Sequence, residues 1–305
     1  MYQPESSTAP QTQTQTVRRA RPLLGTFVEI ALEGCHETTA GRAFTAGFSA
    51  IEKVQSLMSA HDPASDIGRF NNARLGEPVR VHRWTWYVIR VALSLANESD
   101  GAFDPTVAAD LSMYGYLPRV GPMLHTERRA KWDDILLLPG RLLSARRPAR
   151  LDLGGIAKGF ALDRAVAALQ AAGAKSGLVN AGGDLRAFGP KAWPVQVRHP
   201  ADPARAALAL ELRDAALCTS SPYFSRKTWR GREVSALLQS PARTPYLSAA
   251  SATVLAPTAI LADALSKPAL LAPDACEKLL TRHRAYAFLL DAEGRCRALS
   301  SNVAP

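Results

Sequence analysis

One short stretch, Leu151–Asp163, combines residue types that could bind an anion. Its sequence is LDLGGIAKGFALD, in which Asp152 closes an apolar run that predicts a strand and Lys158 begins a helical apolar spacing. The adjacent Gly154 and Gly155 allow the backbone to approach a ligand closely. Because N–H groups at a helix N-terminus attract phosphate and a lysine adds positive charge, the stretch is an expected anion site. The simpler alternative is a tight turn with a surface lysine.

Three further stretches carry polar side chains in or beside turns. Ser59–Asn71 contains His61, Gly101–Val107 contains Asp104 just before a proline, and Asn180–Asp184 holds a glycine pair after an apolar run. The proline keeps the preceding aspartate out of helical geometry, and paired glycines let a backbone approach a flat ligand. Taken singly, each stretch is more often structural, as a capped loop, a rigid turn or a tight hairpin.

The elements that would position these stretches alternate irregularly along the chain. Apolar spacing predicts helices at Ala43–Met58, Trp84–Asn97, Lys158–Ala172 and Ile260–Ser266, and strands at Thr26–Leu32, Gly177–Val179, Val195–Arg198, Ala207–Leu212, Ala252–Ala256, Tyr286–Leu290 and Cys296–Leu299. Several strands are hairpin-like and no βαβ unit repeats. The expected fold class is therefore α+β, with largely antiparallel sheets and flanking helices.

The composition is that of a globular chain of 305 residues. Residues 1–16 are polar and low in complexity, which predicts a disordered tail, and residues 17–305 show no clear linker, which favours a single domain. No apolar run approaches the roughly 20 residues of a membrane span, and no secretory signal is visible, so we expect a cytoplasmic protein. The four cysteines form no CxxC pair, which disfavours a zinc site or a disulfide framework.

The formal charge of +10 raises the question of nucleic-acid binding. Its arginines lie in small clusters such as Arg18–Arg21 and Arg226–Arg230, with acidic residues interspersed. No zinc-finger, RRM or KH signature accompanies them. We therefore expect no nucleic-acid partner and a solvated basic surface that helps to attract an anionic ligand.

The order of these motifs resembles the ApbE-type flavin transferases, the FAD:protein FMN transferases. That family carries approximately MGT, MSxYxPxSxxSRFN, GxFDPTV, DLGGIAKGYAxD, NxGGD, HIIDPxTGxP and ADALxT. The corresponding segments here are LLGT, MSAHDPASDIGRFN, GAFDPTV, DLGGIAKGFALD, NAGGD, a degraded sixth element and ADALSK. The resemblance covers about residues 21 to 300.

The resemblance implies an ApbE-like fold and a magnesium-dependent enzyme. Such an enzyme binds FAD, transfers FMN to a Ser or Thr hydroxyl of an acceptor flavoprotein and releases AMP. The Gly155 carbonyl and the Asp263 carboxylate are the implied magnesium ligands, and Asp263 is also the implied catalytic residue. The positions that match the family's FAD-contacting residues are Leu24, His61, Ala102, Phe103, Asp104, Asp152, Lys158 and Leu238.

The chain departs from the family pattern next to the implied metal site. The family's metal-binding Thr lies four residues after its Asp, on the same helical face, and Lys267 stands there in this chain. An ammonium group cannot ligate magnesium, and its charge would repel the ion or replace it as counter-charge. Pro268 follows at once, and a proline inside the helix is expected to end or kink it.

The sixth element is also altered. The alignment that keeps its last proline sets Ala236–Pro245 against HIIDPxTGxP, so the family's His and Asp are absent. Leu237 and Leu238 retain the apolar pair that would touch the flavin. Elsewhere, His61 replaces a Tyr that would pack on the flavin, and Leu24 replaces a Met.

These departures leave two alternatives beside the transferase. The first is a family member that binds flavin without transferring it and acts as a carrier or scaffold, which Lys267, Pro268 and Ala236 favour. The second is an FAD pyrophosphatase, in which water replaces the acceptor hydroxyl; intact metal ligation would favour it, so the same substitutions count against it. The sequence does not identify the acceptor protein.

Overall fold

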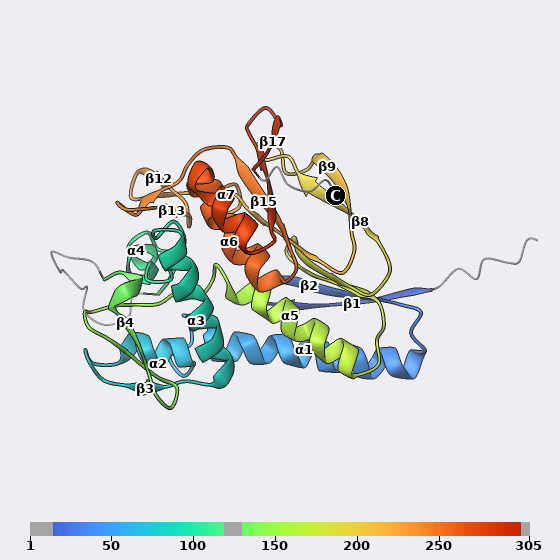
Figure 1. Ribbon diagram of the computed structural model, residues 1–305, viewed down its shortest axis with the longest axis horizontal. Coiled ribbons are helices and arrows are strands. Elements are labelled where there is room, and N and C mark those ends of the chain that lie inside the picture. The colour runs from blue at the N-terminus through green and yellow to red at the C-terminus, as the bar shows by residue number, and fades with distance from the viewer. Residues whose placement is uncertain (1–14, 119–129, 300–305) are drawn as a thin grey trace, which may run out of the picture.

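The computed structural model describes residues 15–118 and 130–299. Its centre is an eight-stranded sheet in the order β1-β2-β6-β7-β10-β15-β16-β17, antiparallel throughout (Figure 1). These strands are β1 Thr16–Leu23, β2 Thr26–Glu33, β6 Gly177–Ala181, β7 Asp184–Phe188, β10 Ala216–Ser220, β15 Ser251–Ala256, β16 Tyr286–Leu290 and β17 Cys296–Ala298. The predicted α+β class with largely antiparallel sheets and flanking helices is confirmed.

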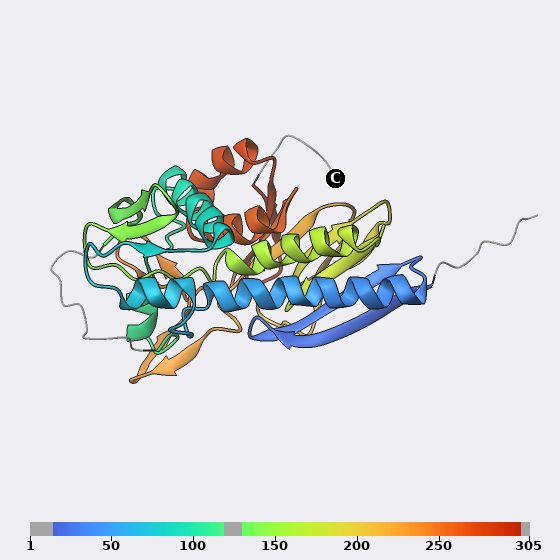
Figure 2. The ribbon, with the colours of Figure 1, turned by 90° about the horizontal axis from the view of Figure 1, so that it is seen from below.

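Helices cover one face of this sheet. They are α1 Glu37–Met58, α5 Ala157–Ala171, α6 Ala259–Leu271 and α7 Pro273–Arg282. Figure 2 shows α1 and α5 side by side, and α1 buries the apolar stripe that the sequence predicts, including Phe44, Phe48 and Ile51. The predicted α1 is confirmed, although the helix starts earlier, at Glu37.

The other face of the sheet is covered by a hairpin of β8 Trp193–Arg198 and β9 Ala206–Leu212. Residues of β8 alternate between buried and exposed, so its inward side chains form a second, smaller apolar core with Leu185, Leu217 and Leu290 of the central sheet. Both faces are thereby buried. Asp184 and Ser220, at the ends of two central strands, are among the few buried polar groups of this sheet.

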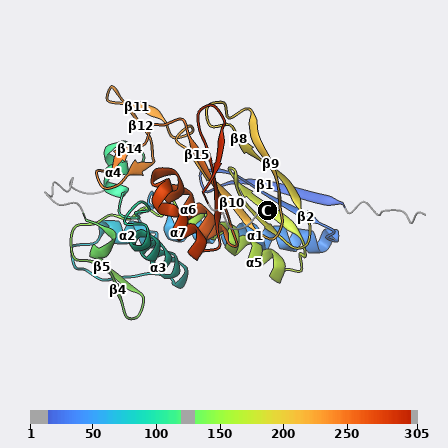
Figure 3. The same cartoon turned by 45° about the horizontal axis from the view of Figure 1, so that its top comes forward.

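The rest of the chain gathers beside α6, at one end of the sheet (Figure 3). It contains α2 Asp66–Asn72, α3 Arg83–Glu98, α4 Ala108–Met113, the 3-10 turn η1 Trp132–Asp134, a β3-β5-β4 sheet of Val79–Arg80, Leu142–Ala145 and Ile135–Leu138, and the ribbons β11–β12 (Lys227–Trp229, Arg232–Val234) and β13–β14 (Leu238–Gln239, Thr244–Pro245). Tyr116 links this region together by donating to the Ser225 carbonyl at 2.5 Å.

The N-terminal arginines belong to an edge strand that the sequence analysis did not predict. Of the predicted tail 1–16, residues 1–14 lie outside the described part of the chain, and Thr16 begins β1. Arg19 and Arg21 lie over the rings of Phe44 and Phe48, at 5.0 and 4.8 Å from the centroids. Charged side chains on an edge strand also discourage pairing with another chain.

Among the described residues, no helix is both long enough and apolar enough to cross a membrane.

Candidate functional site

A pocket of about 260 Å³ lies where four segments meet. The segments are the α3–α4 connection, the loop before α5, the stretch that contains β13, and the C-terminal part of α6. Six of the residues predicted for the site line this pocket: Ala102, Phe103, Asp104, Asp152, Gly155 and Leu238. Lys267 lines it as well. Residues far apart in sequence therefore converge here.

A larger hollow of about 990 Å³ adjoins this pocket. The two share the lining residues Ala102, Asp104, Ser240, Arg243 and Leu271. The outer hollow adds an aromatic ring and several charged side chains, at Lys131, Trp132, Asp133, Asp134 and Arg147. We call the two hollows together the site cleft. It is large enough for a ligand with two aromatic ends.

The loop before α5 is held by hydrogen bonds to Asn71 and Pro105 instead of a neighbouring strand. The Asn71 amide donates to the Leu151 carbonyl at 2.9 Å and accepts from the Leu151 N–H at 2.8 Å. The Asp152 N–H donates to the Pro105 carbonyl at 2.9 Å. The prediction of a strand ending at Asp152 is therefore wrong, because these partners satisfy the backbone outside any sheet.

Asp152 lies on this loop with its carboxylate in the pocket. Its Oδ1 accepts from the Gly154 N–H at 3.2 Å. Burial raises the pKa of Asp152 above its ordinary value, although the charges of His61 and Lys267 act in the opposite direction. His61 itself is exposed on the loop after α1 and does not line the pocket.

The helices α5 and α6 cross so closely that only glycine fits at one point. A Cβ on Gly159 would stand 2.0 Å from the Ala259 carbonyl oxygen. The Gly159 N–H donates to Asp263 Oδ2 at 3.0 Å, while Asp163 accepts from the N–H groups of Ala259 and Ile260, both at 2.9 Å. The end of the LDLGGIAKGFALD stretch thus caps α6 and fixes the place of Asp263.

The buried Asp263 and the half-buried Lys267 form an ion pair one turn apart on α6. The Lys267 ammonium donates to Asp263 Oδ1 and, at 2.8 Å, to the Asp263 main-chain carbonyl. Burial alone would raise the pKa of Asp263, but the positive charges of Lys267 and Lys158 outweigh it and leave this pKa below its ordinary value.

The helix continues past Pro268 to Leu271, so of the two predicted outcomes, an end or a kink, the proline does not end the helix. The kink stays a prediction. A proline inside a helix costs about 3 kcal/mol. The following Ala269 and Leu270 are buried, and α6 packs against α5, β10 and β15. This packing offsets the lost hydrogen bond.

Lys158 pairs with Asp184 and does not line the pocket. Burial would lower the pKa of Lys158, but Asp184 and Asp263 outweigh this and hold it above its ordinary value. Asp184 begins β7 directly after Gly182 and Gly183. These two glycines form the tight turn of the β6–β7 hairpin, with φ values of 64° and 105°. The contact between Lys158 and FAD stays a prediction.

Leu24 also lies outside the pocket lining. It turns the β1–β2 hairpin with a φ of 56°, and its N–H donates to Gln55 Oε1 on α1 at 2.6 Å. Its contact with FAD likewise stays a prediction.

Arg243 is a site residue that the sequence analysis missed. It is buried and forms ion pairs with Asp104 and, at 3.1 Å, with Asp110. It also donates to the Ala130 carbonyl at 2.9 Å. Its φ of 54° is a conformation that favours glycine, and the alignment of Ala236–Pro245 sets it against the family's glycine. The replacement of this glycine by an arginine is the feature of the sequence from which Arg243 could have been identified.

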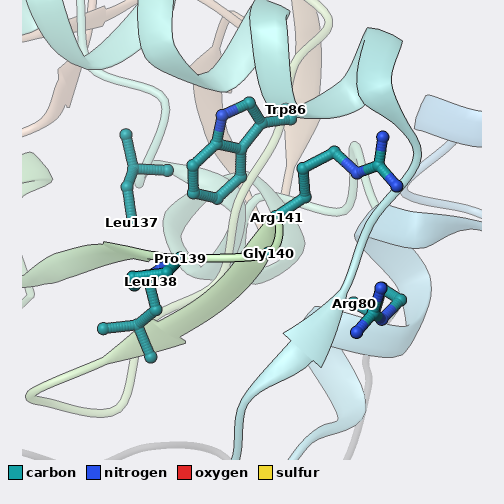
Figure 4. Close-up of a pocket in the computed structure, with 7 residues that line it drawn as sticks. All are labelled: Arg80, Trp86, Leu137, Leu138, Pro139, Gly140 and Arg141. Carbon is teal, nitrogen blue, oxygen red and sulfur yellow. The ribbon is translucent and has the colours of Figure 1, made fainter.

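A separate hollow of about 460 Å³ lies at the β4–β5 turn (Figure 4). Its lining residues are Arg80, Trp86, Leu137, Leu138, Pro139, Gly140 and Arg141. It is larger than the inner pocket, but it contains none of the residues predicted for the site and no carboxylate. We therefore place the functional site in the site cleft.

The residues around Asp263 do not fit a magnesium ion. The oxygen atoms of Asp263 already accept hydrogen bonds. Lys267 donates to Oδ1, the Gly159 N–H donates to Oδ2, and Ser266 Oγ donates to the main-chain carbonyl at 2.7 Å. Within residues 15–118 and 130–299, no three His, Cys, Asp or Glu side chains are grouped so as to hold a metal. An ammonium group at the ion's place repels a divalent cation.

Comparison with known proteins places this geometry in a family. The ApbE family model matches residues 24–290. An FAD:protein FMN transferase of Vibrio cholerae is 28% identical over 71% of this chain and 69% of its own length, and that of Haemophilus influenzae is 26% identical over 86% and 82%. The crystal structure of an ApbE protein from Thermotoga maritima superimposes with a TM-score of 0.81 at 26% identity, covering 93% of this chain and 96% of that one.

A flavin transferase ApbE from Vibrio cholerae shares the fold, with a TM-score of 0.78 at 23% identity over 93% of this chain and 96% of its own. The resemblance first drawn from the motifs is thereby confirmed. The match of the family model spans the pocket, the α5–α6 crossing and the strands of the central sheet from β2 to β16. This chain belongs to the ApbE family.

Proposed function

We propose that this chain is an FAD:protein FMN transferase. It binds FAD in the site cleft, transfers FMN to a Ser or Thr hydroxyl of an acceptor flavoprotein and releases AMP. Membership of the ApbE family and the names of the relatives support the activity. The observation that carries the proposal is the convergence of Phe103, Asp104, Asp152 and Leu238 on one pocket.

The two parts of the cleft suit the two ends of FAD. A pocket of about 260 Å³ is too small for a whole dinucleotide, whereas the adjoining hollow of about 990 Å³ supplies the remaining room. Phe103 and Leu238 give the inner pocket an apolar wall for the flavin ring. The diphosphate would then lie near Gly154 and Gly155, where the backbone can approach it closely.

The reaction is a displacement at phosphorus. The acceptor oxygen forms a bond to the phosphorus of the FMN half, the bond from that phosphorus to the bridging oxygen breaks, and AMP leaves with this oxygen. We assign the hydroxyl proton to Asp152, since burial raises the pKa of this carboxyl and makes it a stronger base. Asp104 is unsuited to this role because it is paired with Arg243.

The test is mass spectrometry of acceptor proteins incubated with FAD and this chain. The purified products of the genes next to this one are the acceptors to try first. We expect one acceptor to gain the mass of FMN while AMP is released. Asp152→Asn should slow transfer by about 100-fold or more while FAD still binds.

The control is Glu211→Gln, which changes an exposed carboxylate on β9 and should leave transfer unchanged. Free FMN and AMP without a modified acceptor would point to a pyrophosphatase. Binding of FAD without any turnover would point to a carrier, and either result would contradict the proposal.

A further inference from the structure

We infer that the Lys267 ammonium group replaces the divalent metal ion in this chain and is the cation that contacts the FAD diphosphate. The inference rests on the proposed function, because it concerns how the same cleft holds FAD. Its consequence is that this chain binds and uses FAD without magnesium. Lys267 on α6 thereby supplies the positive charge beside the diphosphate that the family resemblance assigns to a magnesium ion.

Lys267 lies against both residues that the resemblance implies as metal ligands. Its ammonium donates to Asp263 Oδ1 and to the Asp263 carbonyl, the latter at 2.8 Å. On the other side, a Cβ added to Gly155 would stand only 3.1 Å from Lys267 Cε. The lysine side chain thus fills the space between Asp263 and Gly155, so an ion that bridges them has no room.

The charges around Asp263 are balanced without a metal. Lys267 neutralises Asp263, and Lys158 neutralises Asp184 on the neighbouring strand. Both carboxylates are almost fully buried, and each has its lysine in direct contact. A buried carboxylate that already has a cation and hydrogen bonds does not need a second counter-charge. A magnesium ion would add two positive charges beside an existing one.

The ammonium group remains available to a ligand. The side chain of Lys267 is 18% exposed, and Lys267 lines the pocket together with Asp152, Gly154 and Gly155. An ammonium has three donors, and its contact with Ser266 Oγ is long, at 3.4 Å. A phosphate oxygen in the pocket can take this third donor at little cost, which gives a charge-assisted hydrogen bond.

The experiment measures FAD affinity by calorimetry on the full chain, once in EDTA and once with millimolar magnesium. For the wild type we expect the same Kd, within twofold, under both conditions. Titration of magnesium alone should give no binding heat. Lys267→Thr should gain magnesium binding, and its FAD affinity should then rise at least tenfold when magnesium is added.

Lys267→Met removes the charge without restoring a ligand, so FAD affinity should fall at least tenfold and magnesium should not rescue it. Lys267→Arg keeps the charge and should retain most of the affinity. Lys175→Met is the matched control on an exposed lysine outside the cleft, and it should bind FAD like the wild type. Circular dichroism confirms that each variant is folded.

Wild-type measurements alone can overturn the inference, even if a variant fails to fold. Binding of FAD that needs magnesium, or a magnesium binding heat in the wild type, would show that the ion displaces Lys267. In that case the proposed transferase would stand and only the role of Lys267 would fall. No FAD binding under either condition would instead refute the proposed function, and the inference with it.

Discussion

Two basic residues distinguish this site from the motif pattern of its family, and each stands next to carboxylates. Lys267 holds Asp263 on α6, and Arg243 holds Asp104 and Asp110 across the pocket. The sequence revealed Lys267 because its helical spacing from Asp263 is fixed at one turn. It did not reveal Arg243, because the partners of that side chain lie more than a hundred residues away.

At this scale we predict that Arg243→Met destabilises the protein strongly. The substitution leaves the buried Asp110 and the half-buried Asp104 without their guanidinium group, and breaking a buried ion pair in this way costs about 3–5 kcal/mol. Urea unfolding monitored by circular dichroism measures the loss. Arg213→Met, at an exposed position, is the control and should change stability by less than about 0.5 kcal/mol. Equal effects of the two substitutions would refute the structural role of Arg243.

At the scale of elements, the crossing of α5 and α6 positions the site. Gly159 lets the helices touch, Asp163 caps α6, and Asp263 is thereby held beside Lys267. The LDLGGIAKGFALD motif predicted a helix that starts near Lys158, and α5 confirms this prediction. They did not predict that its partner is a second helix, since only tertiary packing makes a glycine necessary at this point.

We predict that Gly159→Ala lowers stability by about 1–3 kcal/mol, because the new methyl group collides with the Ala259 carbonyl and forces the helices apart. Thermal unfolding of the variant measures this. Gly41→Ala is a matched control inside α1, where a Cβ would meet nothing within 4 Å, and it should stabilise the protein by up to about 1 kcal/mol. A harmless Gly159→Ala would show that the helices do not touch here.

A second prediction for the same crossing concerns the cap. Asp163→Ala removes the acceptor of the Ala259 and Ile260 N–H groups, and loss of such a cap costs about 0.5–2 kcal/mol. The reduced stability is expected in urea unfolding, and hydrogen exchange should quicken at the start of α6. Glu211→Ala removes an exposed carboxylate instead and should do neither. Unchanged exchange in α6 would contradict the capping role.

At the scale of the whole molecule, the sequence predicted the elements whose apolar residues follow a regular period. It did not predict the features that depend on contacts between residues distant in sequence. The apolar stripe of Phe44, Phe48 and Ile51 and the strand Tyr286–Leu290 were found, because their patterns are local. The run that ends at Asp152 was misread as a strand, since its backbone is hydrogen-bonded to the Asn71 side chain of α2 and to the Pro105 carbonyl, both distant in sequence. The small ribbons around the pocket were also missed, because strands of two or three residues carry no detectable period.

The convergence of four segments on the cleft predicts that FAD stabilises the whole chain. At about 100 times its Kd, a ligand specific to the folded state adds about 2.7 kcal/mol of stability, which a thermal-shift assay detects. Ala102→Trp fills the pocket and should abolish the shift. Arg80→Ala, in the hollow of Figure 4, should leave it intact. If Arg80→Ala abolished the shift and Ala102→Trp left it intact, FAD would bind in the hollow at the β4–β5 turn, which would contradict the account.

The most direct test of the account is a crystal structure of the chain with FAD, grown in millimolar magnesium. We predict that the diphosphate lies beside Gly154 and Gly155 with an oxygen within hydrogen-bond distance of Lys267 Nζ. No ion should stand between Asp263 and the phosphates. Density for a magnesium ion bound to Asp263, with Lys267 turned away, would contradict the account, as would FAD bound outside the cleft.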